Sequence, residues 1–112
     1  MHKSSLSENI IYNESKPSIS VLFETETTKE IRIVFKNGQL MKEHKTKFPI
    51  TVEIFKGAID FGVKGTTYNL VKGDLVSLDA SVPHDLIAKQ NSIVRLTLSK
   101  LDSVERVIKV TE

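Results

Sequence analysis

The chain has 112 residues, with 16 basic and 14 acidic side chains, a net charge of +2 and no cysteine. This length suits a single domain with one hydrophobic core. The lack of cysteine excludes thiolate metal sites, a cysteine nucleophile and disulfides, and it fits a cytoplasmic protein. The interspersed charges disfavour nucleic acid as a partner. No apolar stretch is long enough for export or for a membrane span, so we expect no membrane partner.

Strand-like alternation dominates the chain after a polar start. Residues 1–18 are polar and serine-rich, and we predict that they form a flexible N-terminal arm. Residues 19–112 are predicted to form one β domain, because β-branched and polar residues alternate with period two in the runs 31–36, 51–55, 93–98 and 104–110. The apolar spacing of residues 101–108 also suits a short helix. We favour a strand there because the run is rich in valine and isoleucine.

Short turn motifs separate these runs. Asn37-Gly38 is typical of a tight hairpin, because both residues tolerate positive φ angles. Further turns are predicted at Lys56-Gly57, Lys64-Gly65, Lys72-Gly73-Asp74 and Gln90-Asn91-Ser92. Many short strands with no helix between them predict an antiparallel sandwich or barrel. An immunoglobulin-like sandwich and an up-and-down barrel fit this periodicity equally well, although the cysteines and tryptophan of immunoglobulin domains are absent.

Two glycine–histidine segments distinguish among these architectures. Gly38 is followed by five residues and His44, with Gly57 closing the segment, and Gly73 opens a second segment that ends at His84. These segments resemble the two motifs of the cupin superfamily. The local sequence resembles small single-domain cupins at His44-Lys45-Thr46, Pro49-Ile50-Thr51-Val52, Lys72-Gly73-Asp74-Leu75 and Val82-Pro83-His84. The resemblance covers about residues 31–99. It implies an all-β fold, a double-stranded β-helix (jelly-roll) barrel of antiparallel sheets.

The metal motif of the cupins is incomplete in this chain. The resemblance implies three histidines and one glutamate as ligands, but the second histidine position is Thr46 and the glutamate position is Ile50 or Thr51. His44 and His84 remain. Two imidazoles are suitable donors for a divalent metal such as zinc, iron, manganese or nickel, whereas catalytic sites typically have three protein ligands. The alternative interpretation is that both histidines belong to the core and that their ring nitrogens hydrogen-bond a backbone carbonyl or each other.

Three functions are compatible with these residues. The leading hypothesis is a small-molecule-binding protein in which His44, Thr46 and His84 are polar points in an apolar barrel cavity. A metal-dependent enzyme of the dioxygenase or isomerase type, with a two-histidine site, is one alternative. A non-catalytic structural or regulatory module with a filled barrel is the other. The aromatic residues would line the pocket mouth or belong to the core; they are Phe48, Phe55, Phe61 and Tyr68.

The orientation of one strand and the oligomeric state complete the expectations. We expect Ile50, Val52 and Ile54 to face the interior, because the opposite register would bury the unpaired carboxylate of Glu53. We also expect a homodimer. The strand at residues 19–24, together with the apolar residues of the C-terminal segment, would cover a sheet edge across a two-fold axis.

Overall fold

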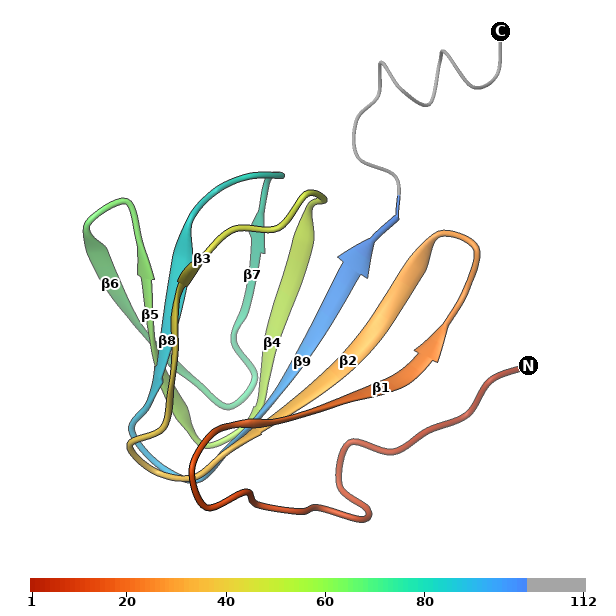
Figure 1. The fold of residues 1–112 in the computed structure, drawn as a ribbon, viewed down its shortest axis with the longest axis horizontal. Coiled ribbons are helices and arrows are strands. Elements are labelled where there is room, and N and C mark those ends of the chain that lie inside the picture. The colour runs from red at the N-terminus through yellow and green to blue at the C-terminus, as the bar shows by residue number, and fades with distance from the viewer. Residues whose placement is uncertain (101–112) are drawn as a thin grey trace, which may run out of the picture.

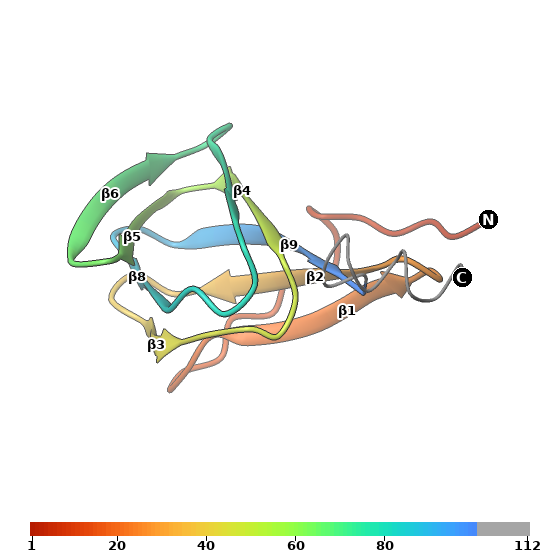
Figure 2. The same cartoon turned by 90° about the horizontal axis from the view of Figure 1, so that it is seen from above.

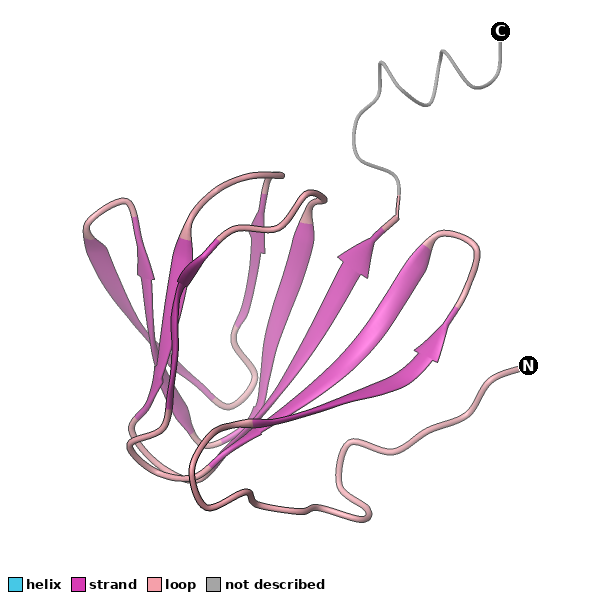
Figure 3. Ribbon diagram, in the orientation of Figure 1, coloured by secondary structure: helices cyan, strands magenta, loops and turns pink. Residues whose placement is uncertain are grey.

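The computed structural model describes residues 1–100, which form nine antiparallel strands and no helix. This confirms the predicted all-β jelly roll (Figures 1 and 3). The strands are β1 (Ser18–Glu24), β2 (Thr28–Phe35), β3 (Leu40–His44), β4 (Ile50–Lys56), β5 (Ala58–Val63), β6 (Thr66–Val71), β7 (Leu75–Leu78), β8 (His84–Ala88) and β9 (Ser92–Ser99). The strand preferred for residues 104–110 lies outside the described residues. The described residues contain no helix long and apolar enough to cross a membrane.

The strands build two facing sheets. One sheet has the order β1-β2-β9-β4-β7 and the other has the order β3-β8-β5-β6. Seen from above, the strands surround a common interior, while β1 and the β1–β2 turn extend beyond the four-stranded sheet (Figure 2). Period-two alternation explains this arrangement, because every second side chain of each strand faces the space between the sheets.

The interior face of β4 has the predicted orientation. Ile50, Val52 and Ile54 are buried in the core, whereas Glu53 lies on the outer face and accepts a hydrogen bond from Nε of Arg95 at 2.7 Å. The register that spares a carboxylate from unpaired burial is therefore the one adopted. The core also contains Ile33, Phe35, Ile59, Phe61, Leu70, Leu86, Ala88 and Val94.

The turns fall where the sequence predicts them, but some close hairpins and others connect the two sheets. Lys64-Gly65 closes the β5–β6 hairpin, with φ angles of 51° and 78° that suit a primed turn. Asn37-Gly38 does not close a hairpin, which corrects the interpretation of that dipeptide. It carries the chain from β2 in one sheet to β3 in the other, and the Gly38 N–H donates to the Ala88 carbonyl at 2.8 Å. The Asn-Gly dipeptide favours a turn, but strand pairing determines which sheet the next strand joins.

The N-terminal arm has several contacts with the strands. The guanidinium of Arg32 on β2 donates to backbone carbonyls of the arm, and Lys36 forms a 2.7 Å ion pair with Glu14. Gln39 donates to the Asn13 carbonyl at 2.7 Å. Arg32 directly opposes Arg95, which belongs to the outer face. The arm therefore contacts the outer face of the five-stranded sheet rather than the barrel interior.

Candidate functional site

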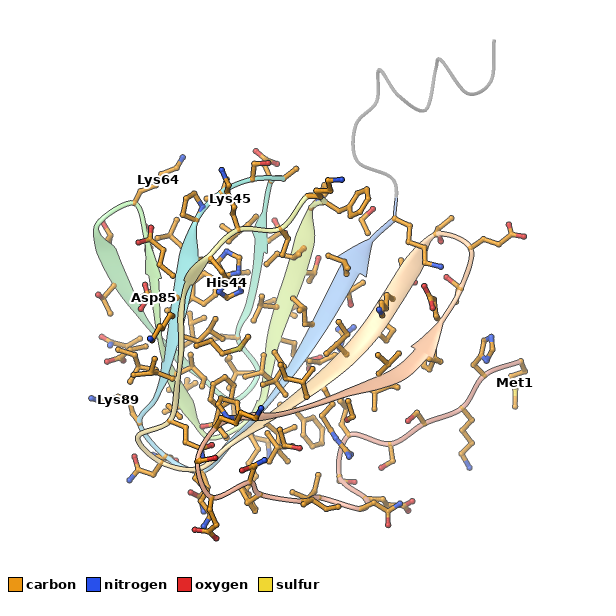
Figure 4. All side chains as sticks on the ribbon, viewed as in Figure 1. Met1, His44, Lys45, Lys64, Asp85 and Lys89 are labelled. Atoms are coloured by element: carbon orange, nitrogen blue, oxygen red, sulfur yellow. The ribbon has the colours of Figure 1, made fainter. Side chains whose placement is uncertain are left out.

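The two barrel histidines meet at one end of the four-stranded sheet. His44 is the last residue of β3 and His84 is the first residue of β8, and the two are direct partners across the strand pair. Directly opposed residues of antiparallel strands share a face, so their side chains are neighbours. Figure 4 shows His44 pointing from β3 into the space between the sheets. The structure thus brings together two residues that lie 40 positions apart in the sequence.

A β-bulge turns His44 inward. Met41 pairs with Leu86, whereas His44 pairs with His84, so β3 contains one residue more than β8 over this stretch. Met41 packs on the core, and simple alternation would place a residue three positions later on the opposite face. The extra residue resets that alternation, as bulges do when they redirect a side chain. The orientation of His44 therefore depends on an irregularity of strand pairing.

Each imidazole has one ring nitrogen engaged and one available. The ring centroids lie 4.4 Å apart with the planes tilted by 60°. Nδ1 of His44 lies 2.7 Å from the Lys42 carbonyl oxygen, and Nδ1 of His84 lies 2.9 Å from the Val82 carbonyl oxygen. A carbonyl can only accept, so both Nδ1 atoms carry a hydrogen. In the neutral rings Nε2 then keeps a lone pair that can accept a hydrogen bond or bind a metal.

Burial favours the neutral form of His84. Its side chain is buried and stacks on Phe61, with ring centroids 5.7 Å apart and planes 19° from parallel. Desolvation lowers the pKa of His84 below its usual value, and the neighbouring His44 lowers it further, while the Val82 carbonyl acts in the opposite direction. A neutral imidazole of this kind is suited to accepting a hydrogen bond from a ligand.

Thr46 is engaged by its own loop. Its hydroxyl donates to the Phe48 carbonyl at 2.7 Å, and its carbonyl accepts the Ser81 N–H at 2.8 Å. These bonds connect the β3–β4 loop to the β7–β8 loop beside the histidines. The hydroxyl hydrogen is thus used locally, which leaves the threonine oxygen as a weak acceptor.

The donor set does not fit a metal centre of the usual size. The carboxylates nearest in sequence are Glu43 and Asp85, and both line a separate depression at the β5–β6 turn that includes neither histidine. Figure 4 shows Asp85 on the opposite side of the sheet from His44. Among residues 1–100 no group of three histidine, cysteine, aspartate or glutamate side chains is placed to hold an ion. Two imidazoles fall short of the three ligands that catalytic metals typically take.

A small apolar cavity adjoins the histidine pair. It has a volume of about 230 Å³ and is lined by Phe61, Val63, Tyr68, Val76, Ser77 and Leu78. It lies between the β5–β6 hairpin and β7, at the side where the edges of the two sheets do not pair. Phe61 connects the two features, because it lines the cavity and also stacks on His84. Val63, another lining residue, is the direct strand partner of His84.

The sequence predicted part of this cavity. Phe61 and Tyr68 were expected at a pocket mouth or in the core, and the structure divides these roles: Phe61 is buried, and Tyr68 is 52% exposed at the rim. Val63, Val76 and Leu78 were not anticipated. Alternation in their strands could have marked them as inward-facing, but only the position of β7 opposite β5 makes them neighbours of one cavity.

The fold is shared with known structures. An RmlC-like cupin from Desulfovibrio desulfuricans superimposes with a TM-score of 0.82 over 88% of this chain and 96% of that chain, at 20% identity. An uncharacterised protein with a double-stranded β-helix domain from Klebsiella pneumoniae gives 0.77 over 88% and 90%, at 18% identity. A cupin superfamily protein from Desulfitobacterium hafniense gives 0.76 over 88% and 97%, at 15% identity. No protein-family model and no curated protein matches the sequence.

These comparisons define the class of protein. The chain has the cupin fold, a small double-stranded β-helix domain, as the glycine–histidine spacing predicts. At these low identities the likeness establishes the fold alone. Function has to be argued from the residues of the site, because one common fold can carry many unrelated chemistries.

Proposed function

We propose that this protein binds a small, mainly apolar molecule inside the barrel. The apolar part of the ligand lies in the cavity beside Phe61, and a hydrogen-bond donor of the ligand reaches Nε2 of His44 or His84. The observation that carries this proposal is the double role of Phe61, which lines the cavity and supports the His84 ring. An apolar pocket with a few convergent polar groups is the usual form of a ligand site.

The size and lining of the cavity narrow the class of ligand. A volume of about 230 Å³ is below the roughly 300–1,000 Å³ of drug-sized sites, so a compact ligand with one small ring or a short branched chain fits best. The free Nε2 atoms are acceptors, which favours a phenol, alcohol or amine over a carboxylate. A negatively charged ligand would also meet an imidazole that burial holds neutral.

A panel of small phenols, aliphatic alcohols and amines tests the proposal, with binding followed by nitrogen-15 chemical shifts. We expect shifts concentrated at Phe61, Val63 and His84. Substituting His84→Phe should weaken donor-bearing ligands about tenfold, because one hydrogen bond in a buried site is worth about 1.4 kcal/mol. His2→Ala is the matched control, since His2 stacks on Phe23 away from the barrel. Ligands that bind without affecting the Phe61 signals would contradict the proposal.

A zinc or nickel titration beside the ligand panel separates the alternatives. A metal-dependent enzyme predicts that zinc or nickel binds with submicromolar affinity and that both His44→Ala and His84→Ala abolish this binding. A structural module with a filled barrel predicts neither metal nor small-molecule binding. Under our proposal a divalent ion binds the two imidazoles weakly, because a third protein ligand is missing from the described residues.

The partner that we propose for the assembly is a second copy of this chain. Val94 and Ile33 are buried in one row across the five-stranded sheet, whereas Ile19, the next residue of the same row, is 57% exposed. Val21 is similarly exposed beside Ile31. Within residues 1–100 the inner face of β1 is thus apolar and exposed, and β1 is an edge strand. A symmetry-related β1 supplies both an apolar face and hydrogen-bonding groups for such an edge.

Light scattering at micromolar concentration tests this assembly. We expect the mass of a dimer for the native chain and that of a monomer for Ile19→Lys combined with Val21→Lys. Leu75→Lys is the matched control, because Leu75 is an equally exposed apolar residue on β7, the opposite edge of the same sheet. A monomeric native chain would contradict the proposal.

A further inference from the structure

Arg32 carries a buried positive charge far from the barrel site. It lies in the middle of β2, opposite Ser20 of β1 and Arg95 of β9, and only 9% of its surface is exposed. Arg95 pairs with Glu30 and Glu53. Arg32 has no such partner among the ion pairs of residues 1–100. A buried charge is unfavourable unless it is paired, so the missing carboxylate needs an explanation.

Backbone carbonyls of the N-terminal arm compensate this charge in part. Nη1 of Arg32 donates to the Ser5 carbonyl at 2.9 Å and to the Glu8 carbonyl at 2.8 Å, and Nη2 donates to the Asn9 carbonyl at 3.2 Å. The arm forms a turn at these residues: Asn9 has a φ of 55°, and the Ser7 and Glu8 N–H groups donate to the Ser5 hydroxyl. These three bonds leave two of the five guanidinium hydrogens unused. Among residues 1–100, Nε is one of the unused donors, buried and without a partner.

A polar cavity lies beside this guanidinium. It has a volume of about 460 Å³ and is formed between the arm and the outer face of the sheet. Its polar lining residues are Lys3, Ser4, Ser5, Glu8, Asn9 and Arg32. Two cations, two hydroxyls and one amide outnumber a single carboxylate, so the cavity favours an anion with several acceptor oxygens.

We propose that this cavity binds a small oxyanion of the phosphate type, either free phosphate or a phosphate monoester. The anion provides the countercharge that Arg32 lacks, and the Lys3 ammonium and the serine hydroxyls donate to its remaining oxygens. Arg32 contributes its positive charge and the hydrogens that the arm carbonyls leave unused, since three of its five donors are already engaged. Glu8 opposes the anion and limits its affinity. Because both sides of the cavity then contact one ligand, binding also holds the arm against the sheet.

Phosphate titration at constant ionic strength tests the site, with sodium chloride as the matched salt and nitrogen-15 shifts as the readout. We expect saturable shifts at residues 3–9 and at Arg32. Lys3→Ala should weaken binding about threefold, the size of an exposed charge contact. Arg32→Lys should weaken it about tenfold or more, because lysine lacks the guanidinium donors that hold the arm carbonyls and that remain for the anion. Glu8→Gln should strengthen it, because the carboxylate that opposes the anion is removed.

The controls keep the proposal falsifiable. Lys16→Ala removes an exposed arm charge outside the cavity and should leave phosphate affinity unchanged. Lys3→Ala and Glu8→Gln alter exposed arm residues, so they remain informative if Arg32→Lys disturbs the fold. Glycerol 3-phosphate distinguishes the two sources: tighter binding than free phosphate assigns a monoester, and equal or weaker binding assigns phosphate itself. Shifts that chloride reproduces, or affinities unaffected by Lys3→Ala and Glu8→Gln, would overturn the site.

Discussion

The histidine pair inside the barrel and the Arg95 cluster on the outer sheet face differ in how fully their polar atoms are used. Arg95 donates to Glu53 at 2.7 Å, to Glu30 at 3.1 Å and to the Thr97 hydroxyl at 2.9 Å, and that hydroxyl donates to Glu30 at 2.6 Å. The hydrogen bond to Glu53 is the largest of the causes that raise the pKa of Arg95. In the histidine pair, within the described part of the chain, only Nδ1 of each ring is hydrogen-bonded, to a backbone carbonyl two residues earlier.

This difference shows how a structural cluster can be told from a candidate site. The charges of the Arg95 cluster satisfy one another across β2, β9 and β4, so the cluster holds the register of the central strands. The histidines have neighbouring lone pairs in a partly buried space beside a cavity. Within residues 1–100 these lone pairs accept no hydrogen bond and are not sealed from solvent, so a ligand can use them. The predictions below test this distinction.

Removing the ring that supports His84 should have the largest effect. We expect Phe61→Ala to lower the free energy of unfolding by about 3–5 kcal/mol, because Phe61 is fully buried and its loss leaves a cavity. Urea unfolding measures this change. Phe61→Leu should cost clearly less, since most of the volume is retained. A loss below about 1 kcal/mol for the alanine variant would mean that the wall between the core and the cavity is poorly packed.

Breaking the Arg95 cluster should have an intermediate effect. We expect Arg95→Met to cost about 2 kcal/mol, because the carboxylates of Glu30 and Glu53 lose their partner in a partly buried position. The double variant Arg95→Met with Glu53→Gln should recover part of this loss in the same urea experiment. Ligand and metal binding should be unchanged in both variants. A change in either binding activity would show that the cluster is more than a structural element.

Replacing Thr46 should have a smaller effect. We expect Thr46→Val to cost about 1 kcal/mol, because the hydrogen bond from its hydroxyl to the Phe48 carbonyl is lost. The affinity for small ligands should be retained, since the hydroxyl hydrogen is used within the loop. Thermal unfolding and the ligand panel measure the two quantities. Loss of binding without loss of stability would instead assign Thr46 to the ligand site, as the sequence predicts.

The pH dependence of stability should give the finest test. Burial lowers the pKa of His84, so the unfolded chain binds this proton more readily than the folded chain. The stability contributed by neutral His84 is present above its unfolded pKa of about 6.5 and is lost as pH falls through the lower folded pKa. We expect a urea midpoint that falls between pH 7.5 and pH 5. His84→Phe should reduce this fall, whereas His2→Ala should not change it.

The sequence predicted the class of fold and the two histidines, His44 and His84, that face the barrel interior. Alternating strands, glycine turns and the spacing of His44 and His84 indicated the barrel, and the cost of burying Glu53 indicated the face of β4 that points inward. The full lining of the barrel cavity could not be predicted from the sequence. Val63, Val76 and Leu78 come from strands of different sheets, and no local pattern brings them together. The anion cavity was equally hidden, because it needs the arm and Arg32 in contact.

Local physical chemistry explains what this sequence determines by itself. Backbone sterics set the turn at Lys64-Gly65, and side-chain alternation sets which residues of a strand face apart, because both depend on neighbours along the chain. The tertiary structure alone decided that Asn37-Gly38 joins two sheets and that a bulge in β3 turns His44 toward His84. Those outcomes depend on which distant strands pair, since pairing is selected by the packing of the whole core.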